Sequence, residues 1–213
     1  KSKSLAFLTV LVTAFSLSAA KKAPIRVLLI DGQNNHNWKA TTPVMVEALK
    51  RDESFEVEVS TTPPKKAGAE DWKKWTPSFK DFDVTLSNYN GELWPEKVCA
   101  DLVDYVKGGG AFVVVHAANN SFSKWPEYNR MIGLGGWGGR NEKSGPYLYF
   151  DDGGKLVRDP RPGRGGSHGP QKEFKVTLRE DSHPITKGMP KVWLHAKDEL
   201  YDSLRGPAEE VEV

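Results

Sequence analysis

Short apolar runs that end in polar loops constrain the fold of this chain more than any other feature. The clearest is FVVVHAANNSF, residues 112–122, in which an apolar run leads directly into His116 and an Asn-Asn-Ser turn. PIRVLLIDG, residues 24–32, ends in the same way at Asp31 and Gly32. Runs this short and rich in β-branched residues predict buried strands. The polar loops then leave the carboxyl ends of the strands, which is where open α/β sheets bind ligands.

Helical patterns alternate with these predicted strands. Residues 42–52, TPVMVEALKRD, place apolar residues at helical spacing after a Thr-Pro start, and residues 95–110 form a second such segment that Pro95 opens and glycines close. FEVEVST, residues 55–61, alternates as a half-buried strand does, and Val84–Ser87 is a further short strand. The resulting order, β-α-β-β-α-β, predicts an α/β fold with a parallel sheet and helices on both faces.

The composition changes beyond residue 120. Two glycine-rich segments, residues 132–145 and 159–170, flank a predicted hairpin at residues 146–156. EFKVTL, residues 173–178, and VWLHAKDELY, residues 192–201, then predict two more strands. Long loops of this kind in a compact domain are usually functional or mobile.

The amino-terminal residues match a secretory signal peptide. KSKS is basic, residues 5–17 are apolar, and SAA places small residues before Lys21. We therefore expect residues 1–20 to be a leader, and the protein to be exported to the periplasm or secreted, without stable membrane insertion once the leader is removed. The alternative is an uncleaved anchor helix. The domain then spans residues 24–213, and because EEVEV, residues 209–213, resembles the start of a strand, we expect the domain to be cut short at this end.

Charge and cysteine content exclude some classes of function. The formal net charge is +2 and no basic stripe accompanies it, so we expect no nucleic-acid partner. The one cysteine, Cys99, has no partner for an internal disulfide and lies on the apolar face of a predicted helix. We interpret it as a buried core thiol and not as a nucleophile. The sequence gives no indication of oligomeric state.

The histidines are the main candidates for chemistry. All five lie in or beside predicted loops: His36, His116, His168, His183 and His195. Since His36 and His116 each follow a strand of a parallel sheet, they are expected to meet at one edge. We expect all five to converge on one cleft with Trp38, Trp125 and Glu199 near them, although His195 falls within a predicted strand. The competing interpretation of each is a hydrogen-bonded surface or capping residue.

Familiar catalytic motifs are absent from the sequence. It contains no G-x-S-x-G elbow, no G-x-x-x-x-G-K-[ST] loop and no G-x-G-x-x-G between a strand and a helix. It also contains no H-x-H, H-x-x-x-H or C-x-x-C spacing, so a zinc site would have to be assembled from distant loops.

Four segments together resemble the trehalose-utilisation (ThuA-like) family: residues 27–38, 108–133, 166–190 and 195–208. The resemblance implies a class I glutamine amidotransferase-like fold, which is a flavodoxin-like three-layer sandwich with a mostly parallel central sheet. Amidotransferase relatives carry a nucleophilic cysteine at the strand-to-helix elbow. Here that neighbourhood reads VVVHAANN and Cys99 lies upstream in a helix, so we expect no cysteine glutaminase.

The resemblance also implies a small-molecule carbohydrate ligand, either trehalose or a related disaccharide, including 3-keto derivatives. We expect a sugar-processing enzyme of hydrolase or isomerase type with His116, His36, Glu199 and His183 as catalytic groups. The residues expected to bind substrate are Asn35, Trp38, Asn119, Asn120, Ser121, Trp125, Tyr128, His168 and Asp198. Two alternatives stay open. One is a non-catalytic carbohydrate-binding or accessory module, and the other is a zinc protein whose ligands come from His36, His116, His168 and His195.

Overall fold

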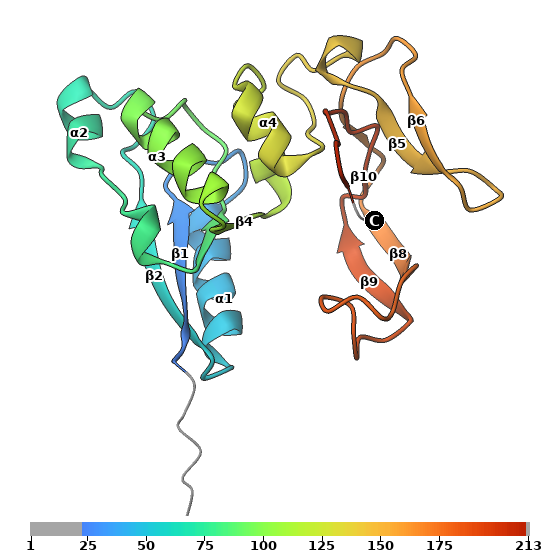
Figure 1. The fold of residues 1–213 in the computed structure, drawn as a ribbon, viewed down its shortest axis with the longest axis horizontal. Helices are drawn as coiled ribbons and strands as arrows, with labels where there is room; N and C mark the ends of the chain where they lie inside the picture. The colour runs from blue at the N-terminus through green and yellow to red at the C-terminus, as the bar shows by residue number, and fades with distance from the viewer. Residues whose placement is uncertain (1–22, 212–213) are drawn as a thin grey trace, which may run out of the picture.

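A four-stranded parallel sheet forms the centre of the fold, with its strands in the order β2-β1-β3-β4. Its strands are β1 (Ile25–Asp31), β2 (Phe55–Thr61), β3 (Val84–Ser87) and β4 (Ala111–Val114). The structure is a computed structural model, shown in Figure 1, and it describes residues 23–211. The predicted signal peptide lies outside the described residues. The α/β class and the parallel sheet expected from the sequence are confirmed.

Helices flank the sheet, and each helix either connects two strands of the sheet or follows the last of them. They are α1 (Trp38–Lys50), α2 (Ala69–Lys74), α3 (Glu96–Lys107) and α4 (Pro126–Ile132), together with the 3-10 turns η1 (Phe79–Asp81), η2 (His116–Asn120) and η3 (Glu142–Ser144). Pro95 precedes α3 and Gly108 ends it, as the sequence predicts. Among residues 23–211, no helix has both the length and the apolar character needed to cross a membrane.

The start of α1 differs from the prediction. The helix begins at Trp38, and Pro43 lies inside it instead of in its first turn. The backbone carbonyl of Asn37 accepts hydrogen bonds from the amides of Ala40 and Thr41, at 3.0 and 3.1 Å, and so forms the first turn four residues earlier than expected. Because α1 starts so close to His36, the loop after β1 is short and its histidine has little freedom to move away from the sheet edge.

The core lies between the sheet and the α2–α3 side of the molecule. Val27, Leu28, Leu29 and Ile30 of β1 are at most 2% exposed, as expected for a strand covered on both faces. Leu28 and Ile30 belong to a cluster with an aromatic character, whose other buried members are Trp75, Phe79, Tyr89, Trp94, Val98 and Leu102. The polar loops at the sheet edge therefore extend from strands that are packed in the hydrophobic core.

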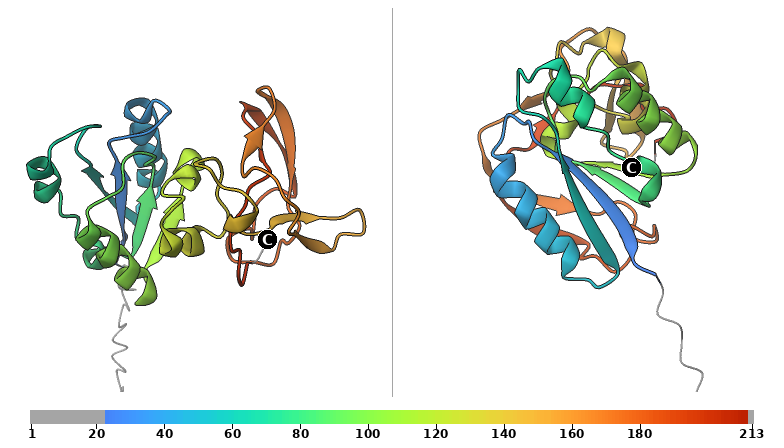
Figure 2. Two further views of the ribbon diagram at one scale, coloured as in Figure 1. Left: turned by 90° about the horizontal axis from the view of Figure 1, so that it is seen from above. Right: turned by 90° about the vertical axis from the view of Figure 1, so that its left-hand side faces the viewer.

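Residues beyond α4 form a second lobe beside the sheet (Figures 1 and 2). It contains three antiparallel pairs made by β5 (Tyr147–Phe150) with β6 (Leu156–Asp159), β7 (Ser167–His168) with β10 (Tyr201–Asp202), and β8 (Lys172–Thr177) with β9 (Val192–Asp198). The predicted hairpin and the two later strands are confirmed. In the expected strand at EEVEV, residues 209–210 form a turn and Glu210 has φ of 50°, which an extended strand does not allow. Residues 212–213 of that segment lie outside the described residues.

The reactivity of the Cys99 thiol provides a test of how α3 packs. It is half-buried beside the aromatic core, and burial together with Glu96 raises the pKa of its thiol to about 11. Because the thiolate is the reactive species, native labelling by iodoacetamide at pH 8 should be about a hundredfold or more slower than labelling of a free thiol. Mass spectrometry should show the normal rate after unfolding in guanidinium. Native labelling at the free-thiol rate would contradict this placement of α3.

Candidate functional site

The loops after β1 and β4 bring two histidines together at the carboxyl edge of the sheet. His36 follows β1 and His116 follows β4, and their ring centroids lie 4.7 Å apart with the planes tilted by 53°. In the sheet, β3 separates the two strands, so the loops and not adjacent strands make this contact. The expectation that His36 and His116 meet at one edge agrees with this geometry.

The backbone turns sharply at His116. The residue has φ of 46°, in the left-handed region that few residues other than glycine adopt, and it begins the 3-10 turn η2. Such a conformation costs roughly 1–3 kcal/mol and persists only where the surroundings hold it. Ala117 and Ala118, at 1% and 0% exposure, anchor the turn in the core, and the imidazole stays 36% exposed at the edge.

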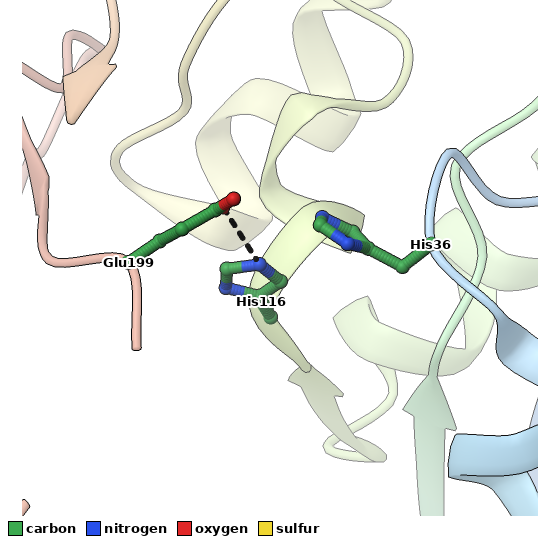
Figure 3. A group of neighbouring side chains, drawn as sticks. All are labelled: His36, His116 and Glu199. Atoms are coloured by element: carbon green, nitrogen blue, oxygen red, sulfur yellow. Dashed lines mark ion pairs between the residues drawn. The ribbon is translucent and has the colours of Figure 1, made fainter. Parts of the chain in front are cut away.

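The second lobe supplies the partners of His116. Glu199 follows β9, and one of its carboxylate oxygens lies 3.5 Å from His116 Nε2 (Figure 3). The Tyr201 hydroxyl and the same nitrogen form a hydrogen bond of 3.0 Å. Figure 3 shows Glu199 and His36 approaching His116 from opposite sides, one from each lobe. Three segments far apart in the sequence therefore meet at one imidazole.

The surroundings of the site favour the neutral forms of the His116 imidazole and the Tyr201 phenol. Burial and the nearby His36 lower the pKa of His116, and Glu199 and Asp198 oppose that shift. Burial raises the pKa of Tyr201, the Asn120 side chain opposes that shift, and the charges of Glu199 and Asp198 add to it. At neutral pH the site therefore contains an unprotonated imidazole nitrogen beside a protonated phenol.

A cavity of about 380 Å³ opens beside this group, within the size range of small-molecule sites. Its walls combine amides, aromatic rings and titratable groups: Asn35, His36, Asn90, Asn120, Trp137, Gly138, His168, Glu199 and Tyr201. A larger groove, about 1030 Å³, lies between α2, η1 and α3. We place the functional site at the smaller cavity because it lies at the carboxyl ends of the strands and is lined by His36 and His168. His116 is not itself part of the wall, but it contacts three wall residues, His36, Glu199 and Tyr201.

Several predicted substrate contacts lie instead in the packing behind the cavity. Tyr128 is 0% exposed and donates a hydrogen bond to the Ala118 carbonyl, and Trp125 stacks on it. Ser121 is 1% exposed, and its hydroxyl donates to the Tyr89 carbonyl. The hydroxyls of Tyr128 and Ser121 are therefore used to hold the loop after β4, and none of these three residues lines the cavity. Asn119 and Trp38 are not among the residues that line the cavity.

The five histidines do not all converge. His36, His116 and His168 belong to the site, because His168 lines the cavity and its ring stacks on Tyr201. His183 lies in the loop between β8 and β9, where its Nδ1 accepts a hydrogen bond from the Ile185 amide. His195 lies within β9 and stacks on Phe174 of β8 at 4.6 Å. The expectation of a single five-histidine cleft is therefore corrected, because β8 and β9 direct His195 into their own hairpin.

Asp198 contributes indirectly. Its carboxylate accepts a hydrogen bond from the Glu199 amide at 2.8 Å, and its charge acts on His116. It orients the residue that contacts His116, although it is not itself part of the cavity wall.

Sequence reasoning missed four residues of the wall: Asn90, Trp137, Gly138 and Tyr201. Asn90 follows β3, so the rule that located His36 and His116 also applies to it. Tyr201 lies two residues after Glu199, but nothing in the local pattern shows that its ring turns to His116. Trp137 lies in a glycine-rich loop whose path the sequence does not specify.

Buried Arg140 holds the loop after β4 in place. Its guanidinium donates hydrogen bonds to the carbonyls of Gly136, Asn120 and Ser121, at 2.6, 3.0 and 2.8 Å. Burial lowers its pKa to about 10, so it remains charged at neutral pH. The side chain is 3% exposed and joins the glycine-rich loop to the turn that carries His116.

Comparisons with known proteins agree with this architecture. The model of the ThuA family, described as trehalose utilisation, matches residues 26–213. A ThuA-like protein from Parabacteroides merdae ATCC 43184, of known crystal structure, is 46% identical, with a TM-score of 0.82 over 87% of this chain and 65% of that chain. A ThuA-like protein from Bacteroides uniformis ATCC 8492 is 18% identical with a TM-score of 0.54, over 87% of this chain and 64% of that chain, and it supports the fold alone. The chain thus spans just under two thirds of either protein. No curated protein matches.

Replacing Arg140 tests how the loop is held. Arg140→Ala leaves three buried carbonyls without their donor, at about 1–3 kcal/mol each, so the free energy of unfolding should fall by about 3 kcal/mol or more. The control is Arg130→Ala, at an exposed position in the last turn of α4, which should change the free energy by no more than about 0.5 kcal/mol. Equal denaturation midpoints for Arg140→Ala and the wild type would contradict this role.

Proposed function

The chain belongs to the ThuA family, described as trehalose utilisation, and on that premise we propose that it is an enzyme that binds a small carbohydrate in the cavity beside His36, His116 and Glu199 and processes it there. The substrate class is trehalose or a related disaccharide, including its 3-keto derivative. The observation that carries the proposal is the meeting of Glu199, His36 and His116 beside a cavity lined by amides and aromatic rings.

The wall of the cavity suits a sugar. Asn35, Asn90 and Asn120 offer amide donors and acceptors, which match the paired donor and acceptor character of sugar hydroxyls. Trp137 and Tyr201 pack edge to face at 4.7 Å and present apolar ring surface to the same space. A mixture of oriented polar groups and flat aromatic surface is the usual composition of a small-ligand site.

The cluster beside the cavity supplies the groups that the reaction needs. Hydrolysis or isomerisation of a sugar requires a base to take a proton and an acid to return one. His116, His36 and the Glu199 carboxylate offer lone pairs, and the Tyr201 hydroxyl, 3.0 Å from His116, offers a proton. Export by the predicted leader would place this activity outside the cytoplasm, where the enzyme would encounter glycosides from the environment.

A turnover screen tests the proposed function. Trehalose, related disaccharides and their 3-keto forms are incubated with the purified protein, and products are followed by NMR while binding is measured by calorimetry. The expected result is turnover of at least one of these sugars. Binding without turnover of any would instead make the protein a carbohydrate-binding accessory module, and neither binding nor turnover would overturn the carbohydrate assignment.

His116→Gln isolates the reacting group. Glutamine is similar in size and polar, so the melting temperature should change little, whereas turnover should fall by about a hundredfold or more, the scale expected for losing an acid–base group. Glu173→Gln, at an exposed position on β8, is the matched surface control and should leave turnover unchanged. Full activity in His116→Gln would remove the centre of the proposal. A fall in activity that only follows a lower melting temperature would make His116 a support for its loop.

A further inference from the structure

Three donor side chains beside the cavity are arranged as a ligand set. His36, His116 and Glu199 each offer one ligand atom, and these atoms all lie within 4.8 Å of one another. Ligand atoms around one tetrahedral zinc ion, each about 2.0–2.2 Å from the metal, lie about 3.3–3.6 Å apart. Side-chain movements of about 1 Å would therefore bring all three atoms within reach of one cation.

A second observation points to a missing partner. His36 Nε2 is buried and makes no hydrogen bond within the described part of the chain. Buried polar atoms are nearly always satisfied, and an unpaired one costs about 1–3 kcal/mol. His36 belongs to the same group of three as His116 and Glu199, so a cation that this group bound through His36 Nε2 would satisfy that nitrogen.

The charges also favour a cation. The side chain of Glu199 is only 17% exposed, and its ion-pair contact is with His116, which carries a charge only when protonated. Asp198 adds a second carboxylate to the electrostatic surroundings of His116, and the other groups acting on that ring are His36 and His168. A divalent ion would balance the negative charge of these two carboxylates. No lysine or arginine is among the groups that act on His116, so none of them supplies that balance.

We propose that His36, His116 and Glu199 bind one first-row divalent cation of the zinc class, with its open coordination positions facing the sugar cavity. Two imidazoles and one carboxylate are a ligand set used by catalytic zinc and non-haem iron sites, which leave positions free for water or substrate. Hard cations such as Mg²⁺ and Ca²⁺ prefer oxygen ligands and should bind weakly. His168 and His195, which the sequence suggested as ligands, lie outside this group of three.

The site differs from the local zinc motifs that sequence searches detect. Its ligands come from the loop after β1, the turn after β4 and the segment after β9, so no two of them are close in sequence. If the cation binds His116 through Nε2, it competes with the Tyr201 hydroxyl, which forms a hydrogen bond of 3.0 Å with that nitrogen. Bound metal would release the hydroxyl toward the cavity, where the hydroxyl can contact substrate.

Metal binding is measured directly and without sugar. Protein purified without a histidine tag is stripped with a chelator, dialysed and titrated with ZnCl₂ by calorimetry, and bound zinc is counted by elemental mass spectrometry. We expect one zinc per chain, with MgCl₂ and CaCl₂ giving no comparable binding. Loss of an outer partner of a metal ligand already weakens affinity about 10–100-fold, so His36→Gln and Glu199→Gln should each weaken it by more than about 100-fold.

The controls distinguish the loss of a metal ligand from the loss of the folded structure. Glu173→Gln, a carboxylate on the exposed side of β8, should bind zinc as the wild type does, and circular dichroism should show that all variants are folded. Tyr201→Phe should bind at least as tightly, because it removes a competitor. Zinc absent from the wild type, or retained by folded His36→Gln and Glu199→Gln, would overturn the inference. Zinc binding without sugar turnover would leave the inference intact and contradict only the proposed function.

Discussion

The return of the chain from its second lobe to the edge of the parallel sheet is the constraint on which the site depends. Gly135 and Arg205 exchange two backbone hydrogen bonds of 2.9 Å, and the Gly166 amide donates to the Ser203 carbonyl at 2.7 Å. The contact is so close that a Cβ on Gly206 would overlap the Gly133 carbonyl. These backbone contacts fix the segment that carries Glu199 and Tyr201, and without them His116 would face only His36.

Two buried arginines stabilise that arrangement from within. Arg140 joins the glycine-rich loop to the turn after β4, as its bonds to three carbonyls show. Arg205 is 0% exposed, lies 3.5 Å from the centre of the Tyr147 ring and donates to the carbonyls of Gly145 and Arg161. Each guanidinium group donates several hydrogen bonds to loop carbonyls that have no partner in a strand. The long loops can therefore be irregular and still hold side chains at defined positions.

The sequence predicted the sheet better than the site. Strands such as Val84–Ser87 and the hairpin at residues 146–156 are confirmed, because a short apolar or alternating pattern reports directly on burial. The proximity of His36 and His116 followed from the parallel sheet. The contact of Glu199 and Tyr201 with His116 is set by loops between residues 133 and 205, whose path depends on glycine conformations and distant hydrogen bonds. For the same reason, His183 and His195 could not be separated from the other histidines by local pattern.

The central claim is that His36 and His168, which line the cavity, and His116, which contacts its wall, form one ligand site that His183 and His195 do not join. Imidazole ¹⁵N–¹H correlation spectra, assigned with single His→Gln variants, test it directly during titration with trehalose and 3-keto-trehalose. The account predicts that the signals of His36, His116 and His168 shift together along one saturation curve while those of His183 and His195 stay in place. Sugar-dependent shifts confined to His183 or His195, or no shift of any histidine with either sugar, would contradict it.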